Sequence, residues 1–157
     1  MEANPGTTAA AASKAVATAL AIGANVDLLN YDPIAAASAS TGTGQAEALS
    51  IQIKAAQVAN LLVTGAVAVS QAGGTSYEAA AADVLARLVT EITNAASSPT
   101  AVLVTLNSPA VLTRVLSNVT TDLVELIVKG NTISATTLQN LYDFQKVVQD
   151  DLAQAAG

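Results

Sequence analysis

The sequence contains no cysteine, no histidine and no tryptophan, and only 3% of its residues are aromatic. Without cysteine the chain can form neither disulfides nor zinc–thiolate sites, and it has no thiolate nucleophile. Without histidine it lacks the commonest general base and the commonest transition-metal ligand. The remaining residues offer no evident base–nucleophile pair or metal cluster for catalysis, so we expect that the protein is not an enzyme.

Charged residues are also scarce. They make up 11% of the chain, against about 25% in ordinary soluble domains. The net charge is −6 and the six basic residues are scattered singly, so nucleic-acid phosphates should repel the chain and we expect no nucleic-acid partner. An acidic, disulfide-free chain with few lysines is compatible with the cytosol or with bacterial secretion, and it fits a small secreted eukaryotic domain poorly.

The abundant residues are those of α-helices with an aliphatic core. Hydrophobic residues make up 52% of the 157 positions, which is enough for one domain with a substantial core. Helical spacing of the apolar residues predicts helices at about 8–22, 33–38, 45–72, 76–95, 109–129 and 134–154. Residues 100–106 are predicted to form an extended connector. The pattern predicts an all-α fold, an antiparallel helical bundle of four main helices plus two shorter ones, in a single domain over residues 1–157 with 1–7 disordered.

The predicted helix at 45–72 is the longest and the most apolar. Its polar residues follow three- and four-residue steps and form one narrow stripe: Glu47, Ser50, Lys54, Gln57, Thr64 and Gln71. A helix that is apolar over most of the remaining circumference belongs at the centre of a bundle, with this stripe as its polar face. Residues 55–77 carry no charge and are long enough to span a bilayer, but amides and hydroxyls interrupt the run, so we expect no membrane insertion.

Cap residues mark the starts of the predicted helices. Asp32-Pro33 is a cap residue followed by proline at the first helical position. Thr75 and Glu78 form a predicted capping box before the helix at 76–95. These local signals predict where two of the helices begin.

Two predicted helices are clearly amphipathic. The helix at 76–95 should place Asp83, Arg87 and Glu91 on a solvent-exposed face, at four-residue spacing. The helix at 109–129 should bury Leu112, Val115, Leu116, Val119, Leu123, Leu126 and Ile127. Asn118-Val119-Thr120 fits the N-glycosylation sequon, but we discount it because it falls in the middle of this predicted helix, in a chain that we expect to be bacterial.

The most polar stretch, residues 23–33, holds a local cluster of oxygen ligands: Asn25, Asp27, Asn30 and Asp32. These four residues are our candidate metal site, with calcium as the ion. Their spacing does not match the helix–loop–helix calcium motif, which ends in a bidentate glutamate. The interpretation that we favour is capping, with Asp32 at the start of the next helix and Asp27 or Asn25 at the preceding turn.

Residues 26–36, which read VDLLNYDPIAA, resemble a recurring DLL-x-x-DP-I-A segment. That segment is typical of helical modules in very large secreted or surface-anchored bacterial proteins, including repeat-rich calcium-binding adhesins. There it links an alanine-rich helix to one similar to residues 53–60 here, and residues 104–111 are similar to a later connector. The resemblance covers most of the chain from about residue 15, although the lead-in helix is shorter here. It implies a structural or adhesive role and carries over no active site.

These observations predict a non-catalytic structural or interaction module of a large extracellular bacterial protein, acting as a spacer or an adhesive domain. Its partners would be neighbouring domains of the same chain or other proteins, and its location would be extracellular or on the cell surface, with the cytoplasm as the alternative. Two other functions stay open. One is a self-associating subunit of a filament or surface layer, because low charge favours assembly. The other is a carrier that holds an apolar ligand in a cavity of the bundle.

Overall fold

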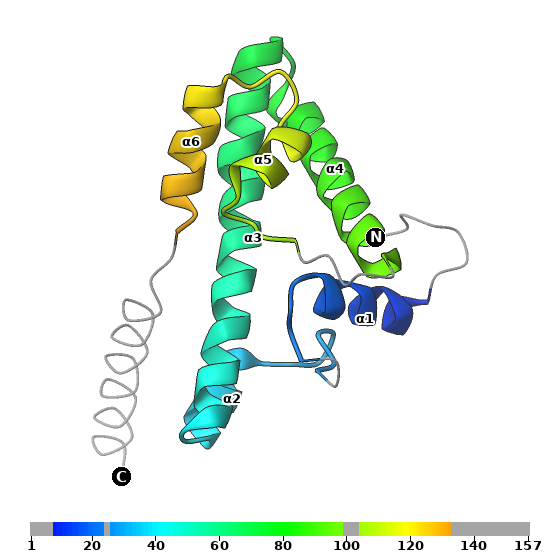
Figure 1. The fold of residues 1–157 in the computed structure, drawn as a ribbon, viewed down its shortest axis with the longest axis vertical. Coiled ribbons are helices and arrows are strands. Elements are labelled where there is room, and N and C mark those ends of the chain that lie inside the picture. Colours follow the sequence, from blue (N-terminus) through cyan, green and yellow to red (C-terminus); the bar gives the residue numbers. More distant parts are fainter. Residues whose placement is uncertain (1–7, 24–25, 99–103, 133–157) are drawn as a thin grey trace. The chain divides into compact units, whose positions relative to one another are not determined.

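The computed structural model describes residues 8–23, 26–98 and 104–132. Within these residues the regular structure is entirely helical (Figure 1), with helices α1 (Ala9–Ala19), α2 (Pro33–Ala39), α3 (Thr43–Gly73), α4 (Tyr77–Ser97), α5 (Pro109–Val115) and α6 (Thr121–Gly130). The prediction of an all-α helical bundle is confirmed. The predicted helix at 134–154 and the predicted disorder of 1–7 lie outside the described residues.

The chain divides into two compact units. Unit 1 comprises Met1–Tyr31 and Ala56–Thr132, and unit 2 comprises Asp32–Ala55 and Ile133–Gly157. Helix α3 therefore contributes its first residues to unit 2 and the remainder, from Ala56 on, to unit 1. The expectation of one domain over 1–157 stays a prediction.

In unit 2, α2 and the first part of α3 pack through alanines. Asp32 caps α2, because its Oδ1 accepts hydrogen bonds from the N–H groups of Ile34 at 2.9 Å and Ala35 at 3.0 Å. This confirms the predicted cap before proline. Ala37 and Ala48 form the buried centre of the contact, and both are at most 2% exposed. Residues with such small side chains let two helices approach closely.

In unit 1, α1 ends in a Schellman motif that is built on an alanine. The N–H of Ile22 donates to the carbonyl of Ala17 at 2.7 Å, the N–H of Ala21 donates to that of Thr18 at 3.2 Å, and Ala21 has a φ of 54°. The sequence predicted a helix to residue 22 with Gly23 as its stop, but the left-handed residue comes two positions earlier. That conformation costs an alanine about 1–2 kcal/mol, and it is held here by the burial of Ile22.

Helix α1 packs against α4, as its low intrinsic stability requires. At its end, the carbonyl of Ala19 accepts a hydrogen bond from the N–H of Val104 at 2.8 Å, which ties the connector before α5 to α1. Along this connector Val104 and Leu106 are buried while Thr105 is exposed, as expected for an extended segment. The predicted connector is therefore confirmed for 104–106, and 100–103 lie outside the described residues.

The unit 1 part of α3 packs tightly at a glycine. A Cβ atom added at Gly65 would lie 2.7 Å from Cδ2 of Leu116 and 3.4 Å from Cγ1 of Val84. Gly65 therefore brings α3 against both α4 and the residue that follows α5. One turn earlier, Leu61 is fully buried. The close packing explains why a glycine is used in the middle of a helix, where it is otherwise unfavourable.

Helix α4 begins at a different cap from the one predicted. Ser76 is the N-cap, since its Oγ accepts a hydrogen bond from the N–H of Ala79 at 3.2 Å. Thr75 instead uses its carbonyl to accept a hydrogen bond from the Ser70 hydroxyl at 2.6 Å. The predicted capping box is wrong because Glu78 then occupies the second helical position, whereas the box requires the third.

The predicted helix at 109–129 is two helices. Helix α5 stops at Val115, with Leu116 as an extended C-cap, and α6 starts after its N-cap Thr120. Between them, Asn118 has a φ of 59°. The segment is rich in β-branched, serine and asparagine residues, which favour caps and turns over helix interiors.

This break changes which residues of α6 are buried. Val124 and Ile127 are buried, whereas Leu123 is 39% exposed and Leu126 is 64% exposed. The prediction that both leucines are buried is wrong, because a new helix after the turn starts with its own rotational phase and does not continue the apolar face of α5.

Candidate functional site

The residues of the candidate calcium site that the structure describes form hydrogen bonds with groups two or three positions away along the chain. Asn25 lies outside the described residues. Asp27 closes a turn, because its Oδ1 accepts from the N–H of Leu29 at 3.1 Å and its Oδ2 accepts from the Asn30 amide at 2.7 Å. Asp32 caps α2. In the described part of the chain no three acidic side chains form a group that could hold a metal, and calcium binding stays a prediction.

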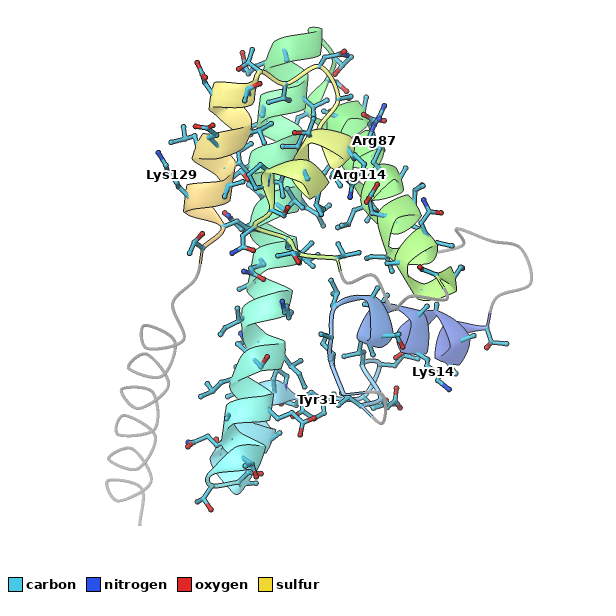
Figure 2. The ribbon with its side chains drawn as sticks, in the orientation of Figure 1. Lys14, Tyr31, Arg87, Arg114 and Lys129 are labelled. Carbon is cyan, nitrogen blue, oxygen red and sulfur yellow. The ribbon has the colours of Figure 1, made fainter. Side chains whose placement is uncertain are left out.

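Charged and polar side chains join α4 to α5 and to the turn after it. We call Asp83, Arg87, Glu91, Arg114 and Ser117 the charged seam, and Figure 2 labels its two arginines. Arg87 Nε contacts both carboxylate oxygens of Asp83 at 3.0 Å, and the Ser117 hydroxyl donates to the same carboxylate at 2.7 Å. Arg114 Nε and Nη2 each lie 2.9 Å from an oxygen of Glu91. The sequence predicted a solvated face on α4, but two of its carboxylates bind residues outside this helix, Ser117 in the turn and Arg114 in α5.

The contacts of the charged seam shift two pKa values further from neutral pH. The hydrogen bond from Ser117 is the main cause that lowers the pKa of Asp83 below its ordinary 3.8, with partial burial opposing it and Arg87 assisting. The hydrogen bond to Glu91 raises the pKa of Arg114. Both groups are therefore held in their charged forms. A general acid or base needs a pKa near the working pH, and neither shift moves its group toward neutral pH.

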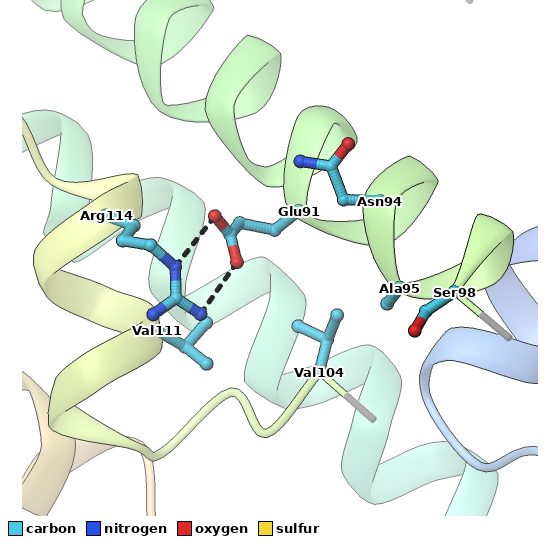
Figure 3. Close-up of a pocket in the computed structure, with 7 residues that line it drawn as sticks. All are labelled: Glu91, Asn94, Ala95, Ser98, Val104, Val111 and Arg114. Atoms are coloured by element: carbon cyan, nitrogen blue, oxygen red, sulfur yellow. Dashed lines mark hydrogen bonds and ion pairs between the residues drawn. The ribbon is translucent and has the colours of Figure 1, made fainter. Parts of the chain in front are cut away.

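A small pocket opens beside the Glu91–Arg114 ion pair (Figure 3). Its volume is about 200 Å³, and it is lined by Glu91, Asn94, Ala95, Ser98, Val104, Val111 and Arg114. Ala95, Val104 and Val111 are buried and apolar. Sites for small molecules measure about 300–1,000 Å³, and the two charged groups at this pocket already bind each other. The pocket therefore gives little support to an apolar-ligand carrier.

A buried cluster of amides joins three separate segments of unit 1. We call Gln57 and Asn60 of α3, the carbonyl of Leu106 and Asn131 the amide cluster. Asn131 is the C-cap of α6 and is fully buried; its Nδ2 donates to the Leu106 carbonyl at 2.7 Å and its Oδ1 accepts from Asn60 Nδ2 at 3.1 Å. Its own carbonyl accepts from Gln57 Nε2 at 3.1 Å. One residue thus ties α6 to α3 and to the connector before α5.

Gln57 does not belong to an exposed polar stripe. It is only 5% exposed, and its Oε1 has no hydrogen-bond partner within the described part of the chain. The predicted stripe is therefore wrong at this position, because α6 and the connector cover that face of α3. Amides do not titrate near neutral pH, so the amide cluster supplies no general acid or base, and its hydrogen bonds hold the helices in one arrangement.

No pattern in the sequence indicated the contacts that Asn131, Arg114 and Ser117 make. Asn131 reads as an ordinary helix stop after Gly130, and its bond to Gln57 spans 74 positions. A signal was present at Gln57, since Leu61 one turn later interrupts the polar track that the stripe was assumed to follow.

Comparisons with protein-family models, with curated proteins and with solved structures found no match.

Proposed function

We propose that this chain is a non-catalytic helical module of a large extracellular bacterial protein, in which it acts as a spacer or an adhesive domain. The observation that carries the proposal is the use made of polar side chains in unit 1. The amide cluster fastens α6 and a connector to α3, and the charged seam fastens α5 to α4. Such cross-links favour a single arrangement of helices, which a load-bearing module needs.

The proposed partners are neighbouring domains of the same chain or other proteins, with neither nucleic acid nor a membrane among them. By length and composition α3 could cross a membrane. In unit 1, however, α3 carries Gln57, which is buried against protein and bound to Asn131. A buried amide that donates to the C-cap residue of another helix supports the assignment of α3 as a core helix, since such a group is costly in lipid.

The location is tested by protease treatment of intact cells that produce the protein. Peptides from the exposed turns should be released into the medium without lysis. Peptides that appear only after the cells are broken would overturn the extracellular assignment.

The mechanical role is tested by pulling the chain between two reference domains in a force spectrometer. A spacer should unfold in one cooperative step and refold on relaxation. Asn131→Ala, which opens the amide cluster, should lower the unfolding force, whereas Asn94→Ala on the exposed side of α4 should leave it unchanged. Gradual extension without a cooperative step would contradict a load-bearing spacer.

One observation favours self-association as a second candidate function. Val63 and Val67 lie one turn apart on α3 and are 56% and 48% exposed. Light scattering behind a size-exclusion column would show a mass that rises with concentration if these valines mediate assembly. The double variant Val63→Ser/Val67→Ser should then be monomeric. A mass that stays at the monomer value at every concentration would exclude this candidate.

A further inference from the structure

Asn118, Val119 and Thr120 make up an Asn-X-Ser/Thr sequon, and the fold places it in a turn. The sequence predicted a helix interior here, which is why the sequon was discounted. The structure ends α5 at Val115 and begins α6 at Thr121, so the sequon lies between two helices. We propose that Asn118 is an acceptor site for an N-linked sugar.

The acceptor side chain is accessible. Asn118 is exposed, and its left-handed φ of 59° is one that asparagine tolerates better than most residues. Within the described part of the chain its amide makes no hydrogen bond. The amide nitrogen can therefore reach an enzyme without first losing a partner inside the fold.

The hydroxyl that the sequon requires is accessible as well. Thr120 is exposed and is the N-cap of α6, yet its side chain makes no capping hydrogen bond to that helix. Most threonines at an N-cap use the hydroxyl to satisfy a backbone N–H. Here the hydroxyl stays available, and the intervening Val119 is not proline, which the sequon excludes.

Both ends of the turn are anchored. Leu116 is 2% exposed and holds the start of the turn in the core. Ser117 donates a hydrogen bond to Asp83 at 2.7 Å, and residues from Thr121 on belong to α6. The turn therefore presents the sequon on a defined surface site, where a bulky and strongly hydrated sugar meets solvent and displaces no packed side chain. On a surface with few charges, such a sugar would add solubility.

The transfer needs a sugar carried on a diphosphate as co-reactant. Nδ2 of Asn118 attacks the anomeric carbon, a C–N bond forms, and the bond from that carbon to the diphosphate oxygen breaks. The diphosphate leaves with the electron pair, and Nδ2 gives one proton to a base of the transferase. Asn118-Val119-Thr120 is the only sequon in the 157 residues, so the product carries a single sugar chain.

The test uses the purified full chain, a soluble asparagine-specific glycosyltransferase and a nucleotide-diphosphate hexose, followed by intact-mass measurement and peptide mapping. We expect one hexose on the folded protein, mapped to Asn118. The gain should be lost in Asn118→Gln and in Thr120→Val. It should be kept in Thr120→Ser and in the matched control Thr121→Val, which removes the neighbouring exposed hydroxyl outside the sequon.

A folded chain that gains no hexose overturns the proposal, and so does a gain that persists in Asn118→Gln. A synthetic peptide of residues 114–122 is treated in parallel. If the peptide gains a hexose and the folded chain does not, the transferase accepts the sequence but not the folded turn. Thermal unfolding of each variant checks that a loss of transfer is not a loss of folding. Because the assay uses purified protein, its failure leaves the proposed extracellular module untouched.

Discussion

Replacing Asn131 by alanine removes two hydrogen bonds from the interior of unit 1. The Leu106 carbonyl loses its donor at 2.7 Å, and the Asn60 amide loses its nearer acceptor at 3.1 Å and keeps the Gly130 carbonyl at 3.5 Å. The bond from Gln57 to the backbone carbonyl at position 131 does not depend on the side chain and can persist. The variant therefore measures the contribution of the two hydrogen bonds that the Asn131 side chain makes.

The expected cost follows from burial. A buried polar group left without a partner costs about 1–3 kcal/mol. Leu106 is fully buried, so its carbonyl should carry most of this penalty, whereas Asn60 is only half-buried and water can replace part of its lost bond. We expect Asn131→Ala to lower the free energy of unfolding by about 1–3 kcal/mol, a large share of the roughly 5–15 kcal/mol that holds a typical domain folded.

Urea unfolding followed by circular dichroism measures this loss, and an unchanged m-value shows that the two-state comparison is valid. Asn94→Ala, an exposed amide on α4, is the matched control and should change stability by no more than about 0.5 kcal/mol. A double-mutant cycle with Asn60→Ala should give a coupling of about 0.5–3 kcal/mol. If Asn131→Ala were as stable as the control, or if the coupling were zero, the amide cluster would not hold the helices together.

Three further predictions rest on other contacts. Gly65→Ala should destabilise the fold by about 1–3 kcal/mol, because the added Cβ would lie 2.7 Å from a side-chain atom of buried Leu116. The control Gly73→Ala should not destabilise it, because the nearest atom to that Cβ lies 3.9 Å away. Thermal melts in which Gly73→Ala is the less stable variant would refute this packing. The pKa of Asp83 is lowered in the fold, so its contribution to stability is complete above 3.8 and is lost as the pH falls through the lower folded value. Ser117→Ala should therefore lose less unfolding free energy than the unmodified chain as the pH falls below 3.8. If the two proteins lost the same unfolding free energy over this range, the Ser117 hydrogen bond would not be the cause of the lowered Asp83 pKa. The melting midpoint should be the same in calcium as in a chelator, because the carboxylates of the polar stretch 23–33 already accept hydrogen bonds from neighbouring backbone N–H groups. A midpoint that calcium raises would support the candidate calcium site.

Local sequence signals predicted the fold where the atoms concerned lie close along the chain. The cap at Asp32 succeeds because donor and acceptor are at most three residues apart. The same reasoning failed at Thr75, where Ser76 next to it is an equally good cap. It also failed at 116–120, where the apolar period continues although the residues favour a turn.

The sequence by itself determined the all-α class, the approximate positions of α1 to α4, and the absence of cysteine and histidine chemistry. Tertiary structure alone decided that Gln57 and Asn131 meet, that Glu91 binds Arg114, and that Asn118 is exposed in a turn. The physical reason is that a period of 3.6 residues shows which side chains share a helix face, but not what covers that face. A polar residue is placed inside or outside by the partner that satisfies it, and here the partners lie 23 to 74 positions away.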